Sequence, residues 1–286
     1  MPSPPDSASE SRPDSPPSSQ SGDRLQLAVA ICTMDNIDVI ERCLRSVMDI
    51  ADEVLVVDSG STDGTVELAR SLGARVVHHD WEGMVGQRKF AMTLVRHARW
   101  VLLLDSDESL DPELRDSIAK AVRDEHSAAA GYEIRRMVWF LGDWLRHTFQ
   151  PEWRMRLVRP ERFQITGVGP GGVGGHDHIT VDGPSARLTG ICRHDTWRDL
   201  EHLFERQIFF GARAAKFTDR GGRVSDIVFR PPVAVFKQLV LKHGYRDGPR
   251  GFIACFGVGI GVAMKHVFIM QKKRLGERPA DHRSEH

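Results

Sequence analysis

Apolar residues between positions 25 and 105 alternate between short continuous runs and runs that repeat at the spacing of one helix face. The continuous runs predict buried strands at 25–32, 53–60, 74–79 and 100–105. The runs at helical spacing predict helices at 37–50, 61–73 and 83–98. Four strands that alternate with three helices predict an α/β fold with a Rossmann-like, mostly parallel sheet flanked by helices.

The pattern is less regular after residue 105. A helix is predicted at 111–125 and a strand at 131–142, while residues 140–195 read as aromatic-rich loops. Two further helices are predicted at 199–217 and 231–270, with the sequence RPP at 230–232 as the break between them. The uncharged stretch 251–264 is too short for a membrane span and predicts a core or interfacial helix.

Composition divides the chain into three parts. Residues 1–23 are rich in Pro and Ser and lack an apolar run, which predicts a disordered tail and not a signal peptide. Residues 24–229 hold the α/β pattern, and residues 230–286 are expected to form a basic amphipathic helical region. From residue 230 onward there are eleven Lys or Arg residues against four Asp or Glu residues. This excess favours peripheral contact with an anionic membrane.

Charge and cysteine content exclude other classes of protein. The formal net charge is zero, so the sequence predicts no nucleic-acid partner. The four cysteines show no C-x-x-C spacing. Their scatter argues against a disulfide framework or a structural zinc site and fits a reducing cytoplasm.

Acidic side chains gather at the ends of two predicted strands. Asp58 ends the second strand, and Asp105, Asp107 and Glu108 follow one another at the end of the fourth. The carboxyl ends of parallel strands share one edge, where ligands bind. Asp105 and Asp107 would project to the same side of an extended chain. Such a pair suits Mg²⁺ or Mn²⁺, whose shell is completed by water and phosphate oxygens. The alternative is an acidic cluster that stabilises the start of the helix at 111–125.

At this point the sequence resembles glycosyltransferase family 2, in particular the bacterial enzymes that glycosylate the inner core of lipopolysaccharide. The segments that carry the resemblance are LAVAICTMDNIDVIERCLRSV, ADEVLVVDSGSTDGTVELARSLGARVV, DWEGMVGQRKFAM and WVLLLDSDESLDPEL. The resemblance implies a GT-A fold with a helical C-terminal extension, a nucleotide-sugar donor, a divalent metal and inversion at the sugar carbon.

The resemblance also implies roles for single residues on the donor side. Thr33 and Asp58 are expected to contact the base and ribose of the nucleotide, and Asp35 belongs to the same binding set. Arg88 is expected near the base or the diphosphate. Asp105 is expected to bind both the nucleotide sugar and the metal.

Asp107 is the expected direct ligand of the metal, and His194 is the favoured third ligand. For the catalytic base, two carboxylates remain, Glu152 and Asp177. Asp177 is favoured, because it follows a glycine-rich segment and because arginines near Glu152 in sequence would weaken Glu152 as a base.

The resulting hypothesis is an inverting, metal-dependent hexosyltransferase. Its favoured donor is a UDP-hexose, and its acceptor is the lipopolysaccharide core or a related glycolipid. The expected location is cytoplasmic, peripheral at the inner face of the cell membrane. The alternatives are transfer to a polyprenyl phosphate, nucleotidyl transfer and a non-catalytic nucleotide-sugar-binding protein.

Overall fold

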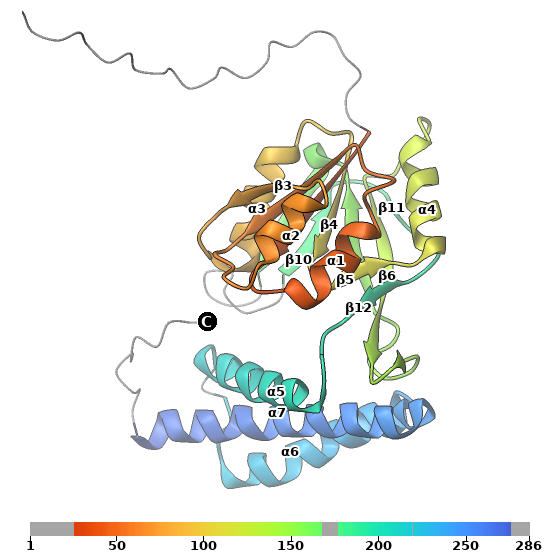
Figure 1. Cartoon of the computed structure of the whole chain (residues 1–286). Helices are drawn as coiled ribbons and strands as arrows, with labels where there is room; N and C mark the ends of the chain where they lie inside the picture. The colour runs from red at the N-terminus through yellow and green to blue at the C-terminus, as the bar shows by residue number, and fades with distance from the viewer. Residues whose placement is uncertain (1–25, 168–176, 219, 276–286) are drawn as a thin grey trace, which may run out of the picture.

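The computed structural model describes residues 26–167, 177–218 and 220–275. Over these residues the chain forms a sheet domain with a layer of helices beneath it (Figure 1). The predicted tail at 1–23, most of the glycine-rich segment before Asp177 and the last eleven residues lie outside the described residues.

The first half of the main sheet is parallel. β1 (Leu27–Thr33) lies between β2 (Glu53–Asp58) and β4 (Trp100–Asp105), and β3 (Arg75–His78) pairs with the outer edge of β2. All seven residues of β1 are buried. A strand covered on both faces reads as a continuous apolar run, and this is why the sequence pattern predicted these strands correctly.

Helices cover both faces of the parallel strands. α1 (Ile37–Arg45), α2 (Thr65–Ser71) and α4 (Pro112–Arg123) pack on one face, where the odd-numbered residues of β1 point. α3 (Gly83–Val95) packs on the other face with the even-numbered residues. This arrangement confirms the predicted α/β class.

The second half of the sheet is mainly antiparallel, and the region 140–195, predicted to be rich in loops, also contains short strands that the sequence did not predict. β8 (Trp153–Val158) pairs antiparallel with β4 and with β6 (Gly131–Phe140). The remaining elements of this half are β5 (Glu108–Leu110), β7 (Asp143–Trp144), a 3-10 turn at Pro160–Arg162, β9 (Phe163–Gly167), β10 (Asp177–Val181), β11 (Ser185–Arg187) and β12 (Cys192–His194). β9 and β10 form a separate hairpin over the α3 face. Most of these strands are too short for a periodic pattern, and β8 buries an arginine in place of an apolar residue.

Five elements form the helical layer: α5 (Leu200–Lys216), α6 (Val224–Phe236), a π-helical turn η3 (Lys237–Leu241), a 3-10 turn η4 (Gly244–Asp247) and α7 (Gly248–Leu275). The predicted break at 230–232 is wrong, because α6 continues through Pro231 and Pro232. The chain reverses instead between Lys237 and Asp247. The predicted boundary between 229 and 230 therefore falls inside α6. Proline removes one backbone donor, but α6 is also held by its packing on α7.

α7 packs between α5 and α6, and its glycines permit this close packing. A methyl group added at Gly257 would lie 2.8 Å from Leu203 of α5, and one added at Gly259 would lie 2.6 Å from Val235 of α6. By length and composition alone, the stretch Gly244–Arg274 is also able to cross a membrane, and a third of its most apolar window is buried in the protein.

Two sets of contacts hold the helical layer on the sheet domain. Phe140 and Trp197 pack with Leu203 of α5 and with the start of α7 in a separate apolar cluster. The buried carboxylate of Asp247 accepts hydrogen bonds from the backbone N–H groups of the segment after β7.

Candidate active site

Two predicted site residues shape the loops after β1 and β2: Asp58 bonds within the second loop, and Asp35 joins the first loop to the second. Asp58 Oδ2 accepts from the backbone N–H groups of Gly60 at 2.9 Å and Ser61 at 3.1 Å. Asp35 Oδ1 accepts from Thr62 N at 2.8 Å, and Asp35 N donates to Ser61 Oγ at 2.9 Å. The structure therefore brings Asp35 and Asp58 to one edge, where their carboxylates shape the loops. Their direct contact with a nucleotide stays a prediction.

Thr33 ends β1 at the same edge. Its side chain is buried, and its Oγ1 has no hydrogen-bond partner in the part of the chain that the structure describes. A buried hydroxyl without a partner is unusual in a protein interior. Its position next to the loops after β1 and β2 is consistent with the predicted role in binding a ligand.

Arg88 lies buried beneath the end of β4, with 1% of its side chain exposed. It reaches from α3 to Asp105, with 2.6 Å between Nη2 and Oδ1. Arg88 Nη1 lies 3.0 Å from Asp177 Oδ2, but the angle at this contact excludes a hydrogen bond. Arg88 Nε and Nη1 thus find no hydrogen-bond acceptor among the described residues. Arg88 is thus a buried cation that pairs with two carboxylates and still has two nitrogen atoms without a hydrogen bond, which suits a further anionic group.

Arg156 of β8 is the second buried cation of the site. Its Nη2 lies 3.1 Å from Asp105 Oδ2 and 2.9 Å from Glu108 Oε1, and its Nε donates to Glu108 Oε2 at 3.2 Å. Glu108 is completely buried and also accepts from Arg136 Nη1 at 3.1 Å. Burial acts to raise the pKa of Glu108, but Arg156 and Arg136 outweigh it and hold the pKa well below its ordinary value. Arginines thus supply the positive charge that the acidic run after β4 requires.

Glu152, one of the two predicted bases, is held by two arginines. Its Oε1 accepts from Arg136 Nη2 at 2.6 Å and from Arg154 Nη2 at 2.7 Å, and its Oε2 accepts from Arg136 Nε at 3.2 Å. Burial acts to raise the pKa of Glu152, but these arginines outweigh it and keep the pKa below its usual value. The other predicted base, Asp177, has an Oδ2 that is buried and lacks a hydrogen-bond partner within the described ranges.

The structure brings Asp107 and His194 together, as predicted for the metal set. His194 Nε2 lies 3.3 Å from Asp107 Oδ2, and His194 Nδ1 lies 2.6 Å from the Thr196 hydroxyl. An oxygen and a nitrogen ligand fit a Mg²⁺ or Mn²⁺ ion that takes its other ligands from water and phosphate. Asp105 is engaged by Arg88 and Arg156 instead, and no group of three metal-binding side chains occurs among residues 26–167, 177–218 and 220–275.

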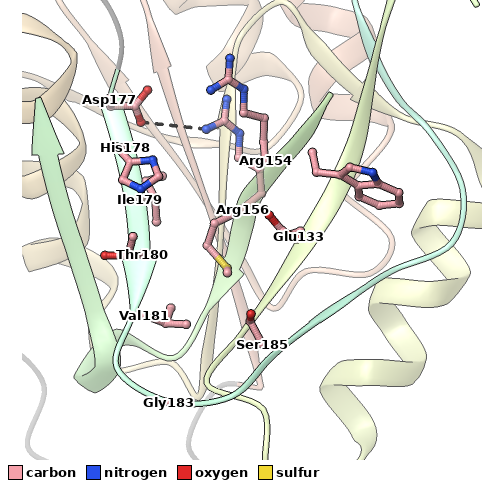
Figure 2. Close-up of a pocket in the computed structure, with 12 residues that line it drawn as sticks. Glu133, Arg154, Arg156, Asp177, His178, Ile179, Thr180, Val181, Gly183 and Ser185 are labelled. Carbon is pink, nitrogen blue, oxygen red and sulfur yellow. Dashed lines mark ion pairs between the residues drawn. The ribbon is translucent and has the colours of Figure 1, made fainter. Parts of the chain in front are cut away.

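A pocket of about 260 Å³ lies next to this network, between β8 and β10. Figure 2 shows Asp177 and His178 on one side of the pocket, opposite Arg154 and Arg156. Arg156 Nη1 and Asp177 Oδ2 are 4.0 Å apart across it. The polar lining suits a small hydrophilic group rather than a large apolar ligand.

Two residues of the network, Glu108 and Arg136, have no role in the sequence-based assignment. Glu108 is visible in the sequence only as part of an acidic run, and Arg136 belongs to no motif. Their partners lie 16 to 48 residues away along the chain. A local pattern therefore contains no signal of the pairing, although charged residues within apolar strands are a general indication of buried ion pairs.

Known proteins place the chain in a family. Residues 28–177 match the family model described as Glycosyl transferase family 2. An uncharacterized glycosyltransferase of Rickettsia bellii (strain RML369-C) is 42% identical over 240 residues, which cover 80% of each chain. The lipopolysaccharide core biosynthesis glycosyltransferase LpsC of Rhizobium meliloti (strain 1021) is 28% identical over 272 residues, covering 90% of this chain and 96% of LpsC.

A solved structure shows a weaker similarity. The mannosyltransferase PcManGT from Pyrobaculum calidifontis, in complex with GDP-Man and Mn²⁺, is 17% identical and has a TM-score of 0.42, covering 83% of this chain and 74% of that one. This score is too low to carry an argument, so the assignment rests on the sequence matches. The range matched by the family model, 28–177, contains the Asp105–Asp107 motif and Asp177. The chain therefore belongs to glycosyl transferase family 2 and is a glycosyltransferase with a GT-A fold.

Proposed function

We propose that this glycosyltransferase moves a hexose from a nucleotide sugar, with UDP-hexose as the favoured donor, to the lipopolysaccharide core or a related glycolipid. The observation that carries the donor assignment is Arg88. It is buried at the carboxyl edge of the sheet and has two donor atoms without a hydrogen-bond acceptor in the described structure. The diphosphate of a nucleotide sugar supplies acceptors of the required charge. The acceptor assignment is supported by the similarity to LpsC, which is named for lipopolysaccharide core biosynthesis.

Asp177 is the better candidate for the base that takes the proton from the attacking acceptor hydroxyl. Asp177 Oδ2 is buried beside the pocket and lies 3.0 Å from Arg88 Nη1 and 4.0 Å from Arg156 Nη1, but it accepts no hydrogen bond from the described residues. Glu152 already accepts hydrogen bonds from arginines on both oxygens, and its lowered pKa makes it a weaker base. Glu152 is better suited to hold Arg136 and Arg154 in place.

The proposed reaction inverts the sugar carbon by direct displacement. Asp177 accepts the hydroxyl proton as the acceptor oxygen attacks the face opposite the diphosphate. Arg88 stabilises the negative charge that gathers on the departing nucleoside diphosphate. Asp107 and His194 would hold a Mg²⁺ or Mn²⁺ ion, which when bound supplies further positive charge to the diphosphate. Arg156 stays paired with Glu108 and orients Asp105 and Asp177.

The proposed location is the cytoplasm, at the inner face of the cell membrane. A glycolipid acceptor is anchored in a bilayer, so an enzyme that uses it must work at the membrane surface.

The donor is tested by thermal denaturation with UDP-glucose, with and without Mn²⁺. At a hundredfold excess over Kd, binding should stabilise the fold by about 2.7 kcal/mol. The reaction is tested with an inner-core oligosaccharide as acceptor. Asp177→Asn should lower kcat by roughly 10²-fold with the UDP-glucose shift retained. Glu152→Gln, the matched carboxylate variant, should raise the acceptor KM more than it lowers kcat.

Other outcomes identify the alternatives. Transfer to polyprenyl phosphate and not to the oligosaccharide would replace the acceptor assignment. A thermal shift without any transfer or UDP-glucose hydrolysis would indicate a non-catalytic nucleotide-sugar-binding protein. Normal turnover in Asp177→Asn with an inactive Glu152→Gln would exchange the roles of the two carboxylates.

A further inference from the structure

The outward face of α6 and of the following turn η3 is apolar. Phe229 is 68% exposed, Val233 66% and Leu241 63%. The other large apolar residues exposed on these two elements are Val224, Val228, Phe236 and Val240. We call these seven residues the α6 face. The opposite side of α6 packs on α7 through residues such as Val235, so the helix is apolar on both its inner and its outer side.

A soluble helix normally turns polar residues outward, and large contiguous apolar patches usually mark interaction sites. Exposed aromatic residues also occur on neighbouring elements, where Tyr245, Phe252 and Phe256 are at least half exposed. Figure 1 shows α6 as the outermost helix of the layer, on the side of α7 away from the sheet domain. Burial against another part of the described chain therefore does not explain this surface.

Positive charge surrounds the α6 face. Residues 220–275 contain eleven Lys or Arg residues and only two acidic residues, Asp226 and Asp247. Asp226 is paired with Arg230 at 2.6 Å, and the carboxylate of Asp247 is buried in hydrogen bonds to the sheet domain. The surface next to the apolar face is therefore strongly cationic.

The cations are concentrated at the start of α6. A pocket of about 380 Å³ there is bordered by Arg220, Arg223, Arg230 and Lys273, with Asp226 as its acidic member. Four cations against one carboxylate favour phosphate groups as neighbours.

We infer that the α6 face docks on an anionic phospholipid bilayer. Its apolar side chains enter the boundary between headgroups and acyl chains, and the surrounding Lys and Arg side chains contact headgroup phosphates. An apolar helix face bordered by cations is the pattern expected of a helix that lies in the membrane interface.

Two other occupants fit less well. The terminal segments 1–25 and 276–286 are polar in sequence and contain no run of large apolar residues that could cover the face. A second copy of the chain would use the same face on both partners, because the simplest dimers are two-fold symmetric. Such pairing would bring the same cations against one another, which opposes association.

The docking surface lies on the same side of the sheet domain as the candidate active site, which is at the carboxyl ends of the parallel strands and is called the catalytic edge here. The segment that leads from β12 into α5 contacts this edge, because Asp195 N donates to Asp107 O at 2.9 Å and Arg198 pairs with Asp38 at the start of α1. Figure 1 shows α5, α7 and α6 following one another away from that edge. A bilayer beneath α6 therefore lies on the catalytic side of the sheet domain. The idea that this arrangement presents a lipid-anchored acceptor to the active site rests on the proposed function.

The full chain is tested by flotation with vesicles of phosphatidylcholine alone or mixed with phosphatidylglycerol, without donor or acceptor. The chain should float with the anionic vesicles, and raising the salt through the physiological range, where the screening length is about 8 Å, should weaken binding. The double variant Phe229→Ser, Phe236→Ser should bind at least tenfold more weakly. Trp81→Ser, which removes an exposed aromatic residue of the sheet domain, is the matched control and should bind like the wild type.

The charge contribution is tested by Lys237→Gln with Lys242→Gln, which should weaken binding roughly tenfold or more, since each cation near an anionic surface contributes about fivefold. The control is Arg70→Gln with Lys120→Gln, which neutralises two exposed cations of the sheet domain and should leave binding unchanged.

Three results would overturn the inference. They are equal binding to neutral and anionic vesicles, unchanged binding of the Phe229→Ser, Phe236→Ser variant, and a wild-type dimer in vesicle-free buffer that this variant converts to monomer. The UDP-glucose thermal shift tests the proposed function independently of vesicle binding. Vesicle binding without a UDP-glucose thermal shift would leave the docking surface standing and remove the donor assignment.

Discussion

The sheet domain buries charged side chains, whereas the helical layer exposes large apolar ones. In the sheet domain, Glu108 and Arg156 are buried and paired, and Phe140 is 1% exposed. In the helical layer, Phe229 and Phe236 face outward beside Lys and Arg residues. Each region thus departs from the usual distribution of residues between core and surface, but in a different direction.

Both departures carry a solvation cost. Burial removes water from the charged groups, a loss that the ion pairs of the network outweigh at Glu108, and exposed phenylalanines keep contact with water. Departures of this kind concentrate at functional sites. The first indicates a ligand held inside the protein, and the second indicates a surface that is covered from outside.

The largest expected effect on stability comes from breaking the buried network. Glu108→Gln leaves Arg156 and Arg136 without their shared carboxylate, so the free energy of unfolding should fall by about 3–5 kcal/mol. Urea denaturation monitored by circular dichroism measures this loss. Glu41→Gln, which removes a solvent-exposed pair with Arg45, is the control and should cost less than about 0.5 kcal/mol. A loss below 1 kcal/mol for Glu108→Gln would mean that the network is not a major determinant of stability.

Acid should weaken the same network. The folded-state pKa of Glu108 is lowered, so its stabilisation is fully present above its unfolded pKa of about 4.3 and is lost as the pH falls through the folded pKa. If the folded carboxylate is still ionised at pH 3, this one group accounts for a loss of about 1.5–2 kcal/mol between pH 7 and pH 3. The wild type should therefore lose more unfolding free energy over this range than Glu108→Gln does. Parallel pH profiles for the two proteins would contradict the prediction.

The packing of the helical layer can be tested with two glycines of α7. A methyl group at Gly251 would lie 2.0 Å from the backbone oxygen of Gly244, whereas one at Gly261 would meet the movable end of Gln207 at 2.7 Å. Both substitutions gain the helix propensity of alanine, about 1 kcal/mol. Gly251→Ala should still destabilise by about 1–2 kcal/mol, because backbone must move. Gly261→Ala should be neutral or slightly stabilising. Equal midpoints of thermal unfolding would show that the turn η4 adapts freely.

The sequence predicted the fold best where nearly every residue of a strand is buried, because such a strand is a continuous apolar run. β1, β2 and β4 are continuous apolar runs, and the acidic residues that follow β2 and β4 lie at one edge as expected. Prediction failed where a buried position carries charge, as in β8, because the apolar pattern is interrupted by Arg156, whose partner Glu108 lies 48 residues away in sequence. It also failed at Pro231 and Pro232, where packing on α7 outweighs the local preference to end a helix.

For the candidate site, the sequence indicated which residues lie near one another better than it indicated which ion pairs they form. Asp107 and His194 come together as the family resemblance implies, whereas the ion pair of Arg88 with Asp105 was not predicted. For the two carboxylates, the sequence suggested the contact of Glu152 with the nearby Arg154, whereas its contact with Arg136 required coordinates.

The smallest expected effect on stability is at the α6 face, where it distinguishes a role in folding from a role in binding. Phe229→Ala should change the free energy of unfolding by less than about 0.5 kcal/mol, because a side chain that stays 68% exposed gains little from folding. Phe140→Ala, the buried counterpart in the sheet domain, should cost about 3–5 kcal/mol. Chemical denaturation in vesicle-free buffer compares the two. A large loss for Phe229→Ala would mean that α6 is packed against protein in solution, and the contrast between the two regions would then disappear. A negligible loss together with weaker vesicle binding would assign the role of Phe229 to contact with a bilayer rather than to folding.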